Sequence, residues 1–317
     1  MKDVSIIIVN WNTKDLLRKC FNSVIDQTNK YSYDIWVVDN NSPDNSAEMV
    51  RTEFPTVKLI ANTTNNGFAK ANNQALREAK SKYYLLLNPD TLVIENAIDK
   101  MIDYMNENKA HVLTCKLLND DLSLQKSVSD FFTLSKSLIE NRLFSEIFKN
   151  FNTRGNKLTS YWDHNSIREI DWAHGAVFMM SYEAFQKVGF LDERFYIYAE
   201  EMDYYMRFHK AGYKAIYNPE IKIIHYSKSS SRQKRAEMFI HNYKSFYLFL
   251  KKHYPKHVYI LYRIRTLLYL NIWIMKYTIE FLVKKIVNQK TDEPKVQLKV
   301  YSQTFLWHLK AESLITI

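Results

Sequence analysis

The sequence is poor in the residues that mark several classes of protein. Its 317 residues include only five glycines and six prolines, which excludes a collagen-like or low-complexity chain. The two cysteines, Cys20 and Cys115, lie far apart and have no metal-ligand spacing, so we expect free thiols in a reducing compartment. The first residues run directly into an apolar segment without a cleavage site. No signal peptide is predicted, and we expect a cytosolic amino terminus.

Positive charge is abundant, but it is confined to one segment. The net charge is +10, and the stretch from Arg232 to Lys285 contains twelve Lys or Arg residues against Glu237 and Glu280. The rest of the chain is therefore neutral. A protein that follows nucleic acid usually spreads positive charge along a groove, so we expect no nucleic-acid partner.

The first 115 residues alternate between strand and helix patterns. Short apolar runs begin at Ser5, Asp34, Val57 and Tyr83, and helical patterns separate them. This alternation predicts an α/β fold with a parallel sheet covered by helices on both faces. With 46% hydrophobic residues, the chain can bury such a core.

Polar side chains gather where three of these predicted strands end. The ends read VNWN (9–12), VVDNNSPD (37–44) and LLLNPD (85–90). Because ligands bind at the carboxyl ends of parallel strands, this rim predicts a site. Proline must end the fourth strand at Asn88-Pro89-Asp90, and a simple turn is the alternative interpretation of that sequence.

The rest of the chain is patterned unevenly. Residues 116 to about 168 are polar and weakly periodic, with helical patches in 135–148. A strand is predicted over 172–180, and two short strands over 215–219 and 222–226. Helices are predicted over 181–188 and 199–212, the second closed by Gly212. From Glu237 onward the chain reads as helical, aromatic and basic.

Seven motifs in order resemble a known family: VNWN, VVDNNSPD, NNGFAKANNQA, LLLNPD, WAHGAVFMM, GFLDERFYIYAEEMDYYMR and IIHYS. Together they are similar to the inverting family 2 glycosyltransferases of the GT-A fold, and within them to the rhamnosyltransferase-like branch. The resemblance implies a GT-A catalytic domain over residues 1–231, with a mostly parallel sheet flanked by helices. It leaves residues 232–317 as a separate basic, aromatic helical region.

The resemblance implies a divalent cation, Mg²⁺ or Mn²⁺, which neutralises the diphosphate of a nucleotide sugar as it leaves. The acidic motif that holds it corresponds to Asn88-Pro89-Asp90, where many relatives have two aspartates. We expect Asp90 to be the main ligand, exposed in the open cleft, and Asn88 to contribute through its amide or a water. His225 matches a position that can complete the metal shell, with a purely structural histidine as the alternative.

The donor site is likewise implied by position. Asp39 corresponds to the contact with the nucleobase, where a carboxylate can accept the imide N–H of uracil or thymine. An Asx-turn within DNNSPD is the alternative. For Lys70 a solvated helix face is the alternative to a phosphate contact. The further donor-site candidates are Asn10, Trp11, Asn66, Gly67, Lys70, Asn73, Asn88 and Asp90.

Inverting transfer requires a general base on the acceptor hydroxyl, and the family takes it from an acidic pair at the start of a helix. Here that pair is Glu200-Glu201, and we assign Glu201 as the base although relatives commonly carry Asp there. Helix-start acids that interact favourably with the helix dipole are the alternative. The acceptor-pocket candidates are Trp172, His174, Gly175 and Asp203, of which Asp203 has a structural bond to a neighbour as its alternative. Lys228 and Arg232 are candidates to cover the phosphates.

The basic region is apolar but interrupted. Ten uncharged residues separate Arg265 from Lys276, whereas a span needs about 20, so no simple transmembrane helix is expected. Aromatic and aliphatic residues mixed with Lys and Arg predict helices that lie on an anionic membrane surface. A hairpin packed on the catalytic domain, or a homodimer, is the alternative.

These observations lead to one expected function. We expect an inverting glycosyltransferase on the inner face of the cell membrane, with a dTDP- or UDP-sugar as donor and a glycan or lipid-linked glycan as acceptor. The branch resemblance favours L-rhamnose from dTDP-L-rhamnose and a cell-surface polysaccharide. The alternatives are a UDP-hexose donor, a nucleotidyltransferase or a non-enzymatic basic binding protein. A nucleotidyltransferase would need a Gly-rich loop after the first strand, which VNWNTKDLL lacks.

Overall fold

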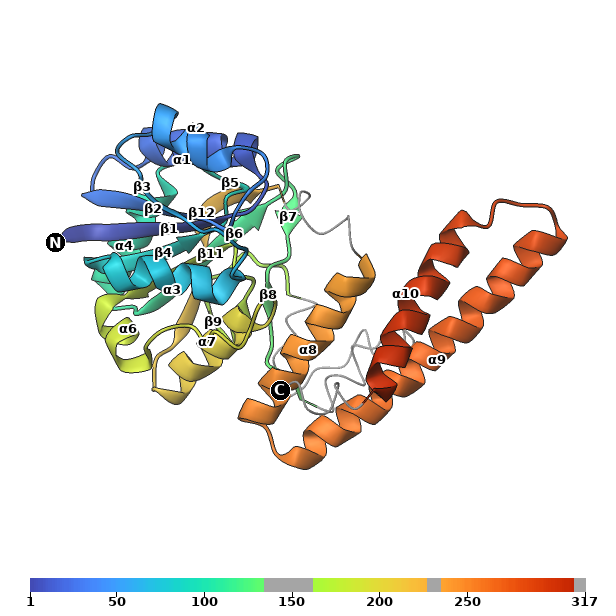
Figure 1. Ribbon diagram of the computed structural model, residues 1–317. Coiled ribbons are helices and arrows are strands. Elements are labelled where there is room, and N and C mark those ends of the chain that lie inside the picture. Colours follow the sequence, from blue (N-terminus) through green and yellow to red (C-terminus); the bar gives the residue numbers. More distant parts are fainter. Residues whose placement is uncertain (134–161, 227–234, 311–317) are drawn as a thin grey trace. The chain divides into compact units, whose positions relative to one another are not determined.

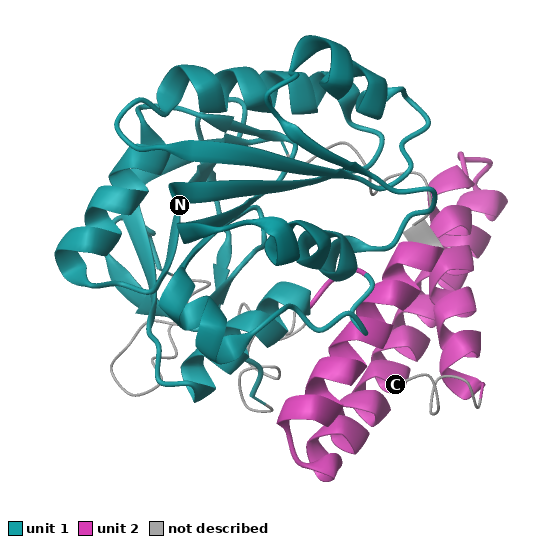
Figure 2. Ribbon diagram, turned by 60° about the vertical axis from the view of Figure 1, so that its left-hand side comes forward, with its two compact units in different colours: residues 1–196, 200–230 teal, residues 197–199, 231–317 magenta. Residues whose placement is uncertain are grey.

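The computed structural model describes residues 1–133, 162–226 and 235–310. The chain divides into two compact units, coloured separately in Figure 2: residues 1–196 with 200–230, and residues 197–199 with 231–317. The expected boundary at 231/232 differs from this division by one residue, and residues 197–199 also cluster with the second unit. The helical patches predicted in 135–148, together with Lys228 and Arg232, lie outside the described residues.

The first unit is built on a ten-stranded sheet in the order β3-β2-β1-β4-β11-β6-β12-β5, with β7 paired to β6 and β9 paired to β12 (Figure 1). A separate small sheet joins β8 to β10. The strands are β1 (Lys2–Asn10), β2 (Tyr33–Asp39), β3 (Lys58–Ala61), β4 (Ser81–Leu87), β5 (Thr91–Val93), β6 (Val112–Leu118), β7 (Leu124–Gln125), β8 (Val128–Ser129), β9 (Arg168–Ile170), β10 (Trp172–Ala173), β11 (Val177–Ser181) and β12 (Ala215–His225).

The sheet is mixed in direction. The strands β3, β2, β1 and β4 are parallel, as the alternating pattern predicts. Beyond them β11 runs antiparallel to both β4 and β6, and β12 returns parallel to β6. The four parallel strands therefore bring their carboxyl ends to one edge, where the polar motifs lie.

Helices cover both faces of this sheet because the buried strands are apolar on both sides. Along β1, Val4, Ile6 and Ile8 join the core on the face of α1, α2 and α4, whereas Ile7 and Val9 join the core on the face of α3, α6 and α7. The helices are α1 (Lys14–Gln27), α2 (Ser46–Glu53), α3 (Phe68–Glu78), α4 (Ala97–Asn108), α6 (Tyr182–Val188) and α7 (Glu200–Lys210).

Two strand predictions were wrong in detail. The run 172–180 is not one strand, because it breaks at His174 and Gly175 into β10 and β11, which belong to different sheets. The runs 215–219 and 222–226 are not two strands but the single β12, whose register against β6 shifts between Asn218 and Lys222. The shift absorbs Pro219, which has no N–H for the ladder.

The second unit is helical, as the sequence indicates. It contains α8 (Arg235–His253), α9 (Lys256–Ile286) and α10 (Asp292–Leu309), with α10 packed against α9 and α8. In the described part of the chain, α9 is the helix that is long and apolar enough to cross a membrane by length and composition. Composition alone therefore does not exclude a span, contrary to the expectation drawn from Arg265 and Lys276.

Candidate active site

The carboxyl ends of β1 and β2 are joined by a buried polar cluster. Asn10 donates from Nδ2 to Oδ1 of Asp39 at 2.8 Å and to the hydroxyl of Ser42 at 3.0 Å. Thr13 precedes α1 but does not cap it, because its hydroxyl donates instead to Oδ1 of Asn10 at 2.6 Å. Asn10 thus uses both N–H groups of its amide within this cluster, one of them to hold Asp39. Trp11 beside it remains 42% exposed, as a residue that stacks on a base must be.

Asp39 is also held by its own loop. The Ser42 hydroxyl donates to Oδ1 at 2.6 Å and the Ser42 backbone N–H donates to Oδ2 at 3.0 Å. The local turn that was the alternative role for Asp39 is therefore present in the structure. It is compatible with recognition, because an oxygen of an ionised carboxylate accepts more than one hydrogen bond and Oδ2 accepts only one of those described.

The loop before α3 places Gly67 where only glycine fits. Its φ is +78°, and a Cβ at this position would lie 2.4 Å from the carbonyl oxygen of Tyr196. The Asn40 amide donates to the Gly67 carbonyl at 3.1 Å and its oxygen accepts the Asn66 N–H at 3.4 Å. These bonds tie the loop to the end of β2. Gly67 thereby brings the start of α3 against the segment that precedes α7.

The other two candidates on α3 lie differently. The Asn73 amide is buried and donates to the Leu191 carbonyl at 2.9 Å and to Glu193 at 3.0 Å. Both of its N–H groups are used within the protein, so Asn73 holds the 191–193 loop and has no N–H left for a donor. Lys70 is exposed on the helix surface, the position that the solvated-face alternative describes.

At the end of β4, Asp90 meets His225 from the end of β12. Nε2 of His225 lies 3.2 Å from Oδ1 of Asp90. Asp90 is 8% exposed, so the expectation of an exposed carboxylate was wrong. The burial follows from pairing: the Tyr226 N–H donates to the Asp90 carbonyl at 2.9 Å, which draws the end of β12 over it.

Gln125 fixes the tautomer of His225. Its Nε2 donates to Oδ1 of Asn119 at 3.0 Å and to the His225 carbonyl at 3.2 Å. Its Oε1 therefore faces Nδ1 of His225, at 2.7 Å, and Nδ1 must be the donor. Nε2 then carries a lone pair that faces the Asp90 carboxylate, and two acceptors that face each other in this way suit a shared cation.

This donor set fits a hard divalent cation. A carboxylate and an imidazole nitrogen converge on one point, although no group of three His, Cys, Asp or Glu side chains converges within the described residues. Mg²⁺ and Mn²⁺ sites of transferases commonly use few protein ligands and complete their shell with substrate phosphates and water. The Asn88 main chain is used structurally, its N–H by the Ala176 carbonyl and its carbonyl by Thr91. A role for its side chain in the metal site stays a prediction.

A three-residue turn, His174 to Ala176, connects the metal pair to the acidic pair. Its last residue, Ala176, accepts the Asn88 N–H at 2.9 Å. Loss of solvation within the surrounding protein lowers the pKa of His174, and the charge of the neighbouring His225 lowers it further. Gly175 lies against Glu201, since a Cβ on Gly175 would be 3.6 Å from the Cβ of Glu201. The Asp90–His225 pair and the Glu200–Glu201 pair therefore both lie near this one turn.

Glu200 and Glu201 begin α7, but their surroundings differ. Within the described residues, one carboxylate oxygen of each glutamate has no hydrogen-bond partner. Glu200 is buried, and burial, followed by the charge of Glu201, raises the pKa of Glu200 well above the usual value. Burial also raises the pKa of Glu201, but hydrogen bonds from its own backbone N–H and then from that of Gly175 oppose that rise. Glu201 is less buried, so it is the member that ionises first. That order agrees with its assignment as the base.

The remaining acceptor candidates divide into two groups. Asp203 is fully buried and paired with Arg207 at 2.9 Å, and its position two residues beyond Glu201 puts it about 200° around the helix. It therefore stabilises α7 and does not face an acceptor beside Glu201. Trp172 and His174 lie beside each other, with ring centroids 5.5 Å apart. The Trp172 indole N–H donates to the Asp130 carbonyl.

The residues immediately before α7 are strained. Tyr198 and Ala199 both have positive φ, +68° and +62°, which is unfavourable for residues with a Cβ. The Ile197 carbonyl accepts the Ser245 hydroxyl of α8 at 2.7 Å. Backbone strain persists where its surroundings impose it, and the Ser245 bond is one such constraint on this segment.

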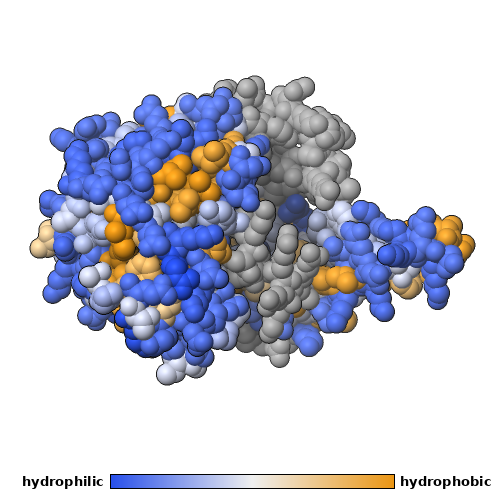
Figure 3. Space-filling view, turned by 90° about the horizontal axis from the view of Figure 1, so that it is seen from above, coloured by the Kyte–Doolittle hydropathy of each residue, from blue (hydrophilic) through white to orange (hydrophobic). Residues whose placement is uncertain are grey.

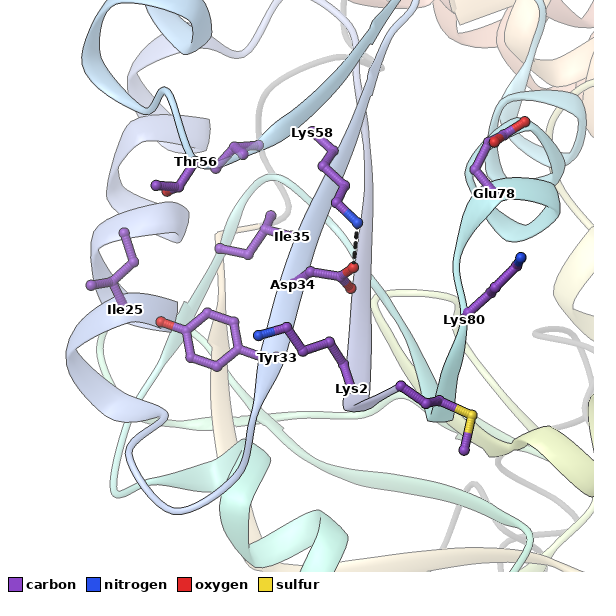
Figure 4. A pocket seen from close by; sticks show the side chains of 11 residues that line it. Lys2, Ile25, Tyr33, Asp34, Ile35, Thr56, Lys58, Glu78 and Lys80 are labelled. Atoms are coloured by element: carbon purple, nitrogen blue, oxygen red, sulfur yellow. Dashed lines mark hydrogen bonds and ion pairs between the residues drawn. The ribbon is translucent and has the colours of Figure 1, made fainter.

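A further hollow of the first unit lies elsewhere. It has a volume of about 730 Å³ and is found at the amino ends of β1, β2 and β3, where Lys58 reaches Asp34 at 2.7 Å (Figure 4). None of the predicted site residues lines it. It is bordered by exposed lysines at the opposite ends of the strands from Asp39 and Asp90, so we do not assign the active site to it.

Two contributors to the site were missed by sequence reasoning. Ser42 lies within the quoted motif VVDNNSPD, so its nearness to Asp39 was available from the sequence. Gln125 lies in the weakly periodic stretch after residue 116, and no local pattern indicates that it meets a histidine one hundred residues later.

Known proteins resemble this chain in sequence and in fold. The family model for glycosyl transferase family 2 matches residues 5–175. The N-acetylglucosaminyl-diphospho-decaprenol L-rhamnosyltransferase of Mycobacterium tuberculosis is 25% identical over 231 residues, which cover 68% of this chain and 74% of that protein. The rhamnosyltransferase WbbL of Escherichia coli K12 is 23% identical over 256 residues, covering 78% and 93%.

Among solved structures, the mannosyltransferase PcManGT from Pyrobaculum calidifontis, in complex with GDP-Man and Mn²⁺, has a TM-score of 0.56 at 14% identity. The alignment covers 98% of this chain and 88% of that one. This likeness establishes the fold, which is of the GT-A type with a mixed sheet flanked by helices.

Proposed function

The chain belongs to glycosyl transferase family 2, and we propose that it transfers L-rhamnose, with inversion, from dTDP-L-rhamnose to a hydroxyl group of a lipid-linked cell-surface polysaccharide precursor. The glycosyltransferase activity follows from the family. The sugar and the acceptor are proposed from the two rhamnosyltransferases that resemble the chain over most of its length.

One observation carries the proposal. The turn from His174 to Ala176 brings the Asp90–His225 pair and Glu201 next to one another, at the carboxyl edge where Asp39 also lies. A leaving diphosphate and an attacking hydroxyl must lie on opposite sides of the anomeric carbon. A site of this class therefore needs separate groups for each, within a few ångströms.

On the acceptor side, we assign the proton to a carboxylate oxygen of Glu201. The Gly175 N–H orients the side chain, and partial burial makes the ionised carboxylate a stronger base than one in water. The buried Glu200 lies beside it, and the charge of Glu201 raises the pKa of Glu200 further. We therefore assign no proton transfer to Glu200.

On the donor side, Asp39 would accept the N3–H of thymine or uracil, and Trp11 would cover the base. Asp90 and His225 would hold a divalent cation, with Gln125 fixing the ring of His225. Bound there, the cation neutralises the charge that develops on the leaving diphosphate. The Asp39 carboxylate selects against cytosine, whose N3 is an acceptor, but does not separate dTDP from UDP.

We propose a cytoplasmic location on the inner face of the cell membrane. A lipid-linked acceptor is presented at that surface, and the basic helical unit supplies the means of reaching it. A homodimer through the same helices is the alternative partner.

The test is a donor screen with purified protein, with dTDP-L-rhamnose, UDP-glucose, UDP-N-acetylglucosamine and GDP-mannose each supplied with Mg²⁺ or Mn²⁺. We expect release of the nucleoside diphosphate dTDP from dTDP-L-rhamnose. This release should be lost in EDTA and absent in the Asp90→Ala variant. Preferential turnover of a UDP-sugar would replace the donor assignment. Full release in excess EDTA would overturn the metal site, and release of pyrophosphate from a nucleoside triphosphate would indicate a nucleotidyltransferase.

A further inference from the structure

The helix α9 carries an exposed apolar row along its length. Leu261, Ile264, Leu268, Ile272, Met275 and Ile279 are each between 48% and 64% exposed. Their spacing of three and four residues puts them on one face, within about 100° of the helix circumference. The row continues to Ile286, so it is about 37 Å long at the rise of an α-helix. We call it the α9 stripe.

Exposed apolar area of this extent marks a surface that meets something else. Orange surface among blue is visible on the helical unit in Figure 3, at the end that carries the turn between α9 and α10. On its other side α9 packs against α10, with Trp273, Tyr277 and Tyr301 stacked at ring distances of 5.6–5.8 Å. The stripe is therefore what remains after the helices of this unit have packed together.

Charge at the margins of the stripe decides between its candidate occupants. Lys276 on one margin and Lys285 on the other are both exposed. The sole acidic residue of α9, Glu280, is paired with Lys284 at 2.8 Å. In a self-association through this face, lysines would meet lysines, whereas an anionic lipid surface attracts both margins.

The basic residues that face inward argue against a span. Arg263 donates to the Tyr259 hydroxyl and to the His308 carbonyl, so its guanidinium is fixed on the packed side. The helix thus has one apolar face and one face with charges bonded inside the unit. Such a helix lies in a membrane surface with its apolar face down, and Lys side chains at its margins reach the headgroups.

We infer that the α9 stripe is the lipid-contacting face of the protein, and that α9 lies along an anionic bilayer surface without crossing it. The inference deepens the membrane location proposed above, but it requires neither the rhamnosyl donor nor the metal. Arg263 and Lys284 are bonded within the unit, so we assign the headgroup contacts of α9 to the exposed lysines Lys276 and Lys285.

The experiment uses the full chain and vesicles of phosphatidylglycerol with phosphatidylethanolamine, compared with phosphatidylcholine. Cys20 and Cys115 are both buried, so a single introduced cysteine can be labelled with an environment-sensitive fluorophore. We expect a blue shift for Leu268→Cys on adding anionic vesicles, and none for Lys80→Cys, an exposed position of the first unit. Equal responses of the two labels would overturn the inference.

Partitioning supplies the second measurement. The triple variant Leu268→Gln, Met275→Gln, Ile279→Gln should bind anionic vesicles at least about tenfold more weakly than wild type, with unchanged donor hydrolysis. If it does not fold by circular dichroism, Lys276→Glu with Lys285→Glu replaces it, with the same expected loss. Unchanged binding would overturn the inference. So would wild-type dimers that the triple variant abolishes, which would assign the stripe to a second copy. Resistance to both high salt and alkaline extraction would assign it to a span.

Discussion

At Gly67 the cost of a steric clash can be separated from the cost of backbone strain, because Gly189 has the same strain without the clash. Gly67 and Gly189 have nearly the same backbone, with φ of +78° and +80° and extended ψ, but a Cβ on Gly189 would meet nothing within 4 Å. Gly67→Ala should lower the free energy of unfolding by about 2 kcal/mol more than Gly189→Ala, because it adds a clash with the Tyr196 carbonyl to the same strain. Thermal unfolding of both variants measures the difference, and equal losses would contradict the contact.

For the general base, Glu201→Gln should lower kcat by about 10²-fold or more while the donor KM stays unchanged, because the amide cannot accept the proton. Glu201→Asp, the residue that relatives commonly carry, is the matched control and should retain most of the activity. Initial rates at saturating acceptor measure both. If Glu200→Gln reduced kcat more than Glu201→Gln, the assignment within the pair would be reversed.

The Gln125 side chain gives the metal site a test that does not depend on turnover. Gln125→Leu removes the acceptor for Nδ1 of His225 and frees the ring to adopt the other tautomer. We expect Mn²⁺ affinity, measured by electron paramagnetic resonance in the presence of dTDP, to fall about 10- to 100-fold. Gln125→Glu keeps an acceptor and should keep the affinity. Equal affinity in Gln125→Leu and wild type would assign Gln125 to packing alone.

At the scale of elements, the amino end of α7 combines buried acids with a helix start. The folded-state pKa of Glu200 is raised above its ordinary value of 4.5, so the protonated side chain favours the fold. That stability is complete below about pH 4.5 and is lost as the pH rises through the folded pKa. Glu200→Gln should therefore raise the melting temperature at pH 8, and less so at pH 4.5. Thermal unfolding of wild type and Glu200→Gln at the two pH values measures the difference, and equal gains at both would contradict the raised pKa of Glu200.

Local sequence pattern predicts the strands and helices whose limits are set by residues close together in the chain. The strand ending at Asn88-Pro89-Asp90 and the helix begun by Glu200 follow from apolar runs, a proline and clustered acids. The insertion of β11 antiparallel between β4 and β6 depends on pairing across ninety residues, which no window of sequence contains. The same holds for the site: Asp90 was identifiable from its strand, but its burial under Tyr226 and its meeting with His225 arise from the sheet order.

At the scale of the whole molecule, the helical unit includes the three residues that precede the base. Ser245→Ala removes the hydrogen bond to the Ile197 carbonyl and should relax the strained Tyr198 and Ala199. We expect kcat to fall about three- to tenfold with unchanged donor affinity, the scale of one neutral hydrogen bond. Ser302→Ala on α10 is the control. A Ser245→Ala enzyme with normal kcat would show that the bond has no bearing on the base.

The clustering of residues 197–199 with the helices has a consequence for recombining such enzymes. A chimera spliced at residue 231 would join a foreign helical region to the native Ile197–Ala199 segment, and the segment would lose the partner that holds its carbonyl. Three splice junctions are needed, one on each side of this segment and one at 231, so that both parts come from the same parent. The helical part is therefore discontinuous in the chain, and exchanging the carboxyl-terminal region alone would leave the Ile197–Ala199 segment with its original parent.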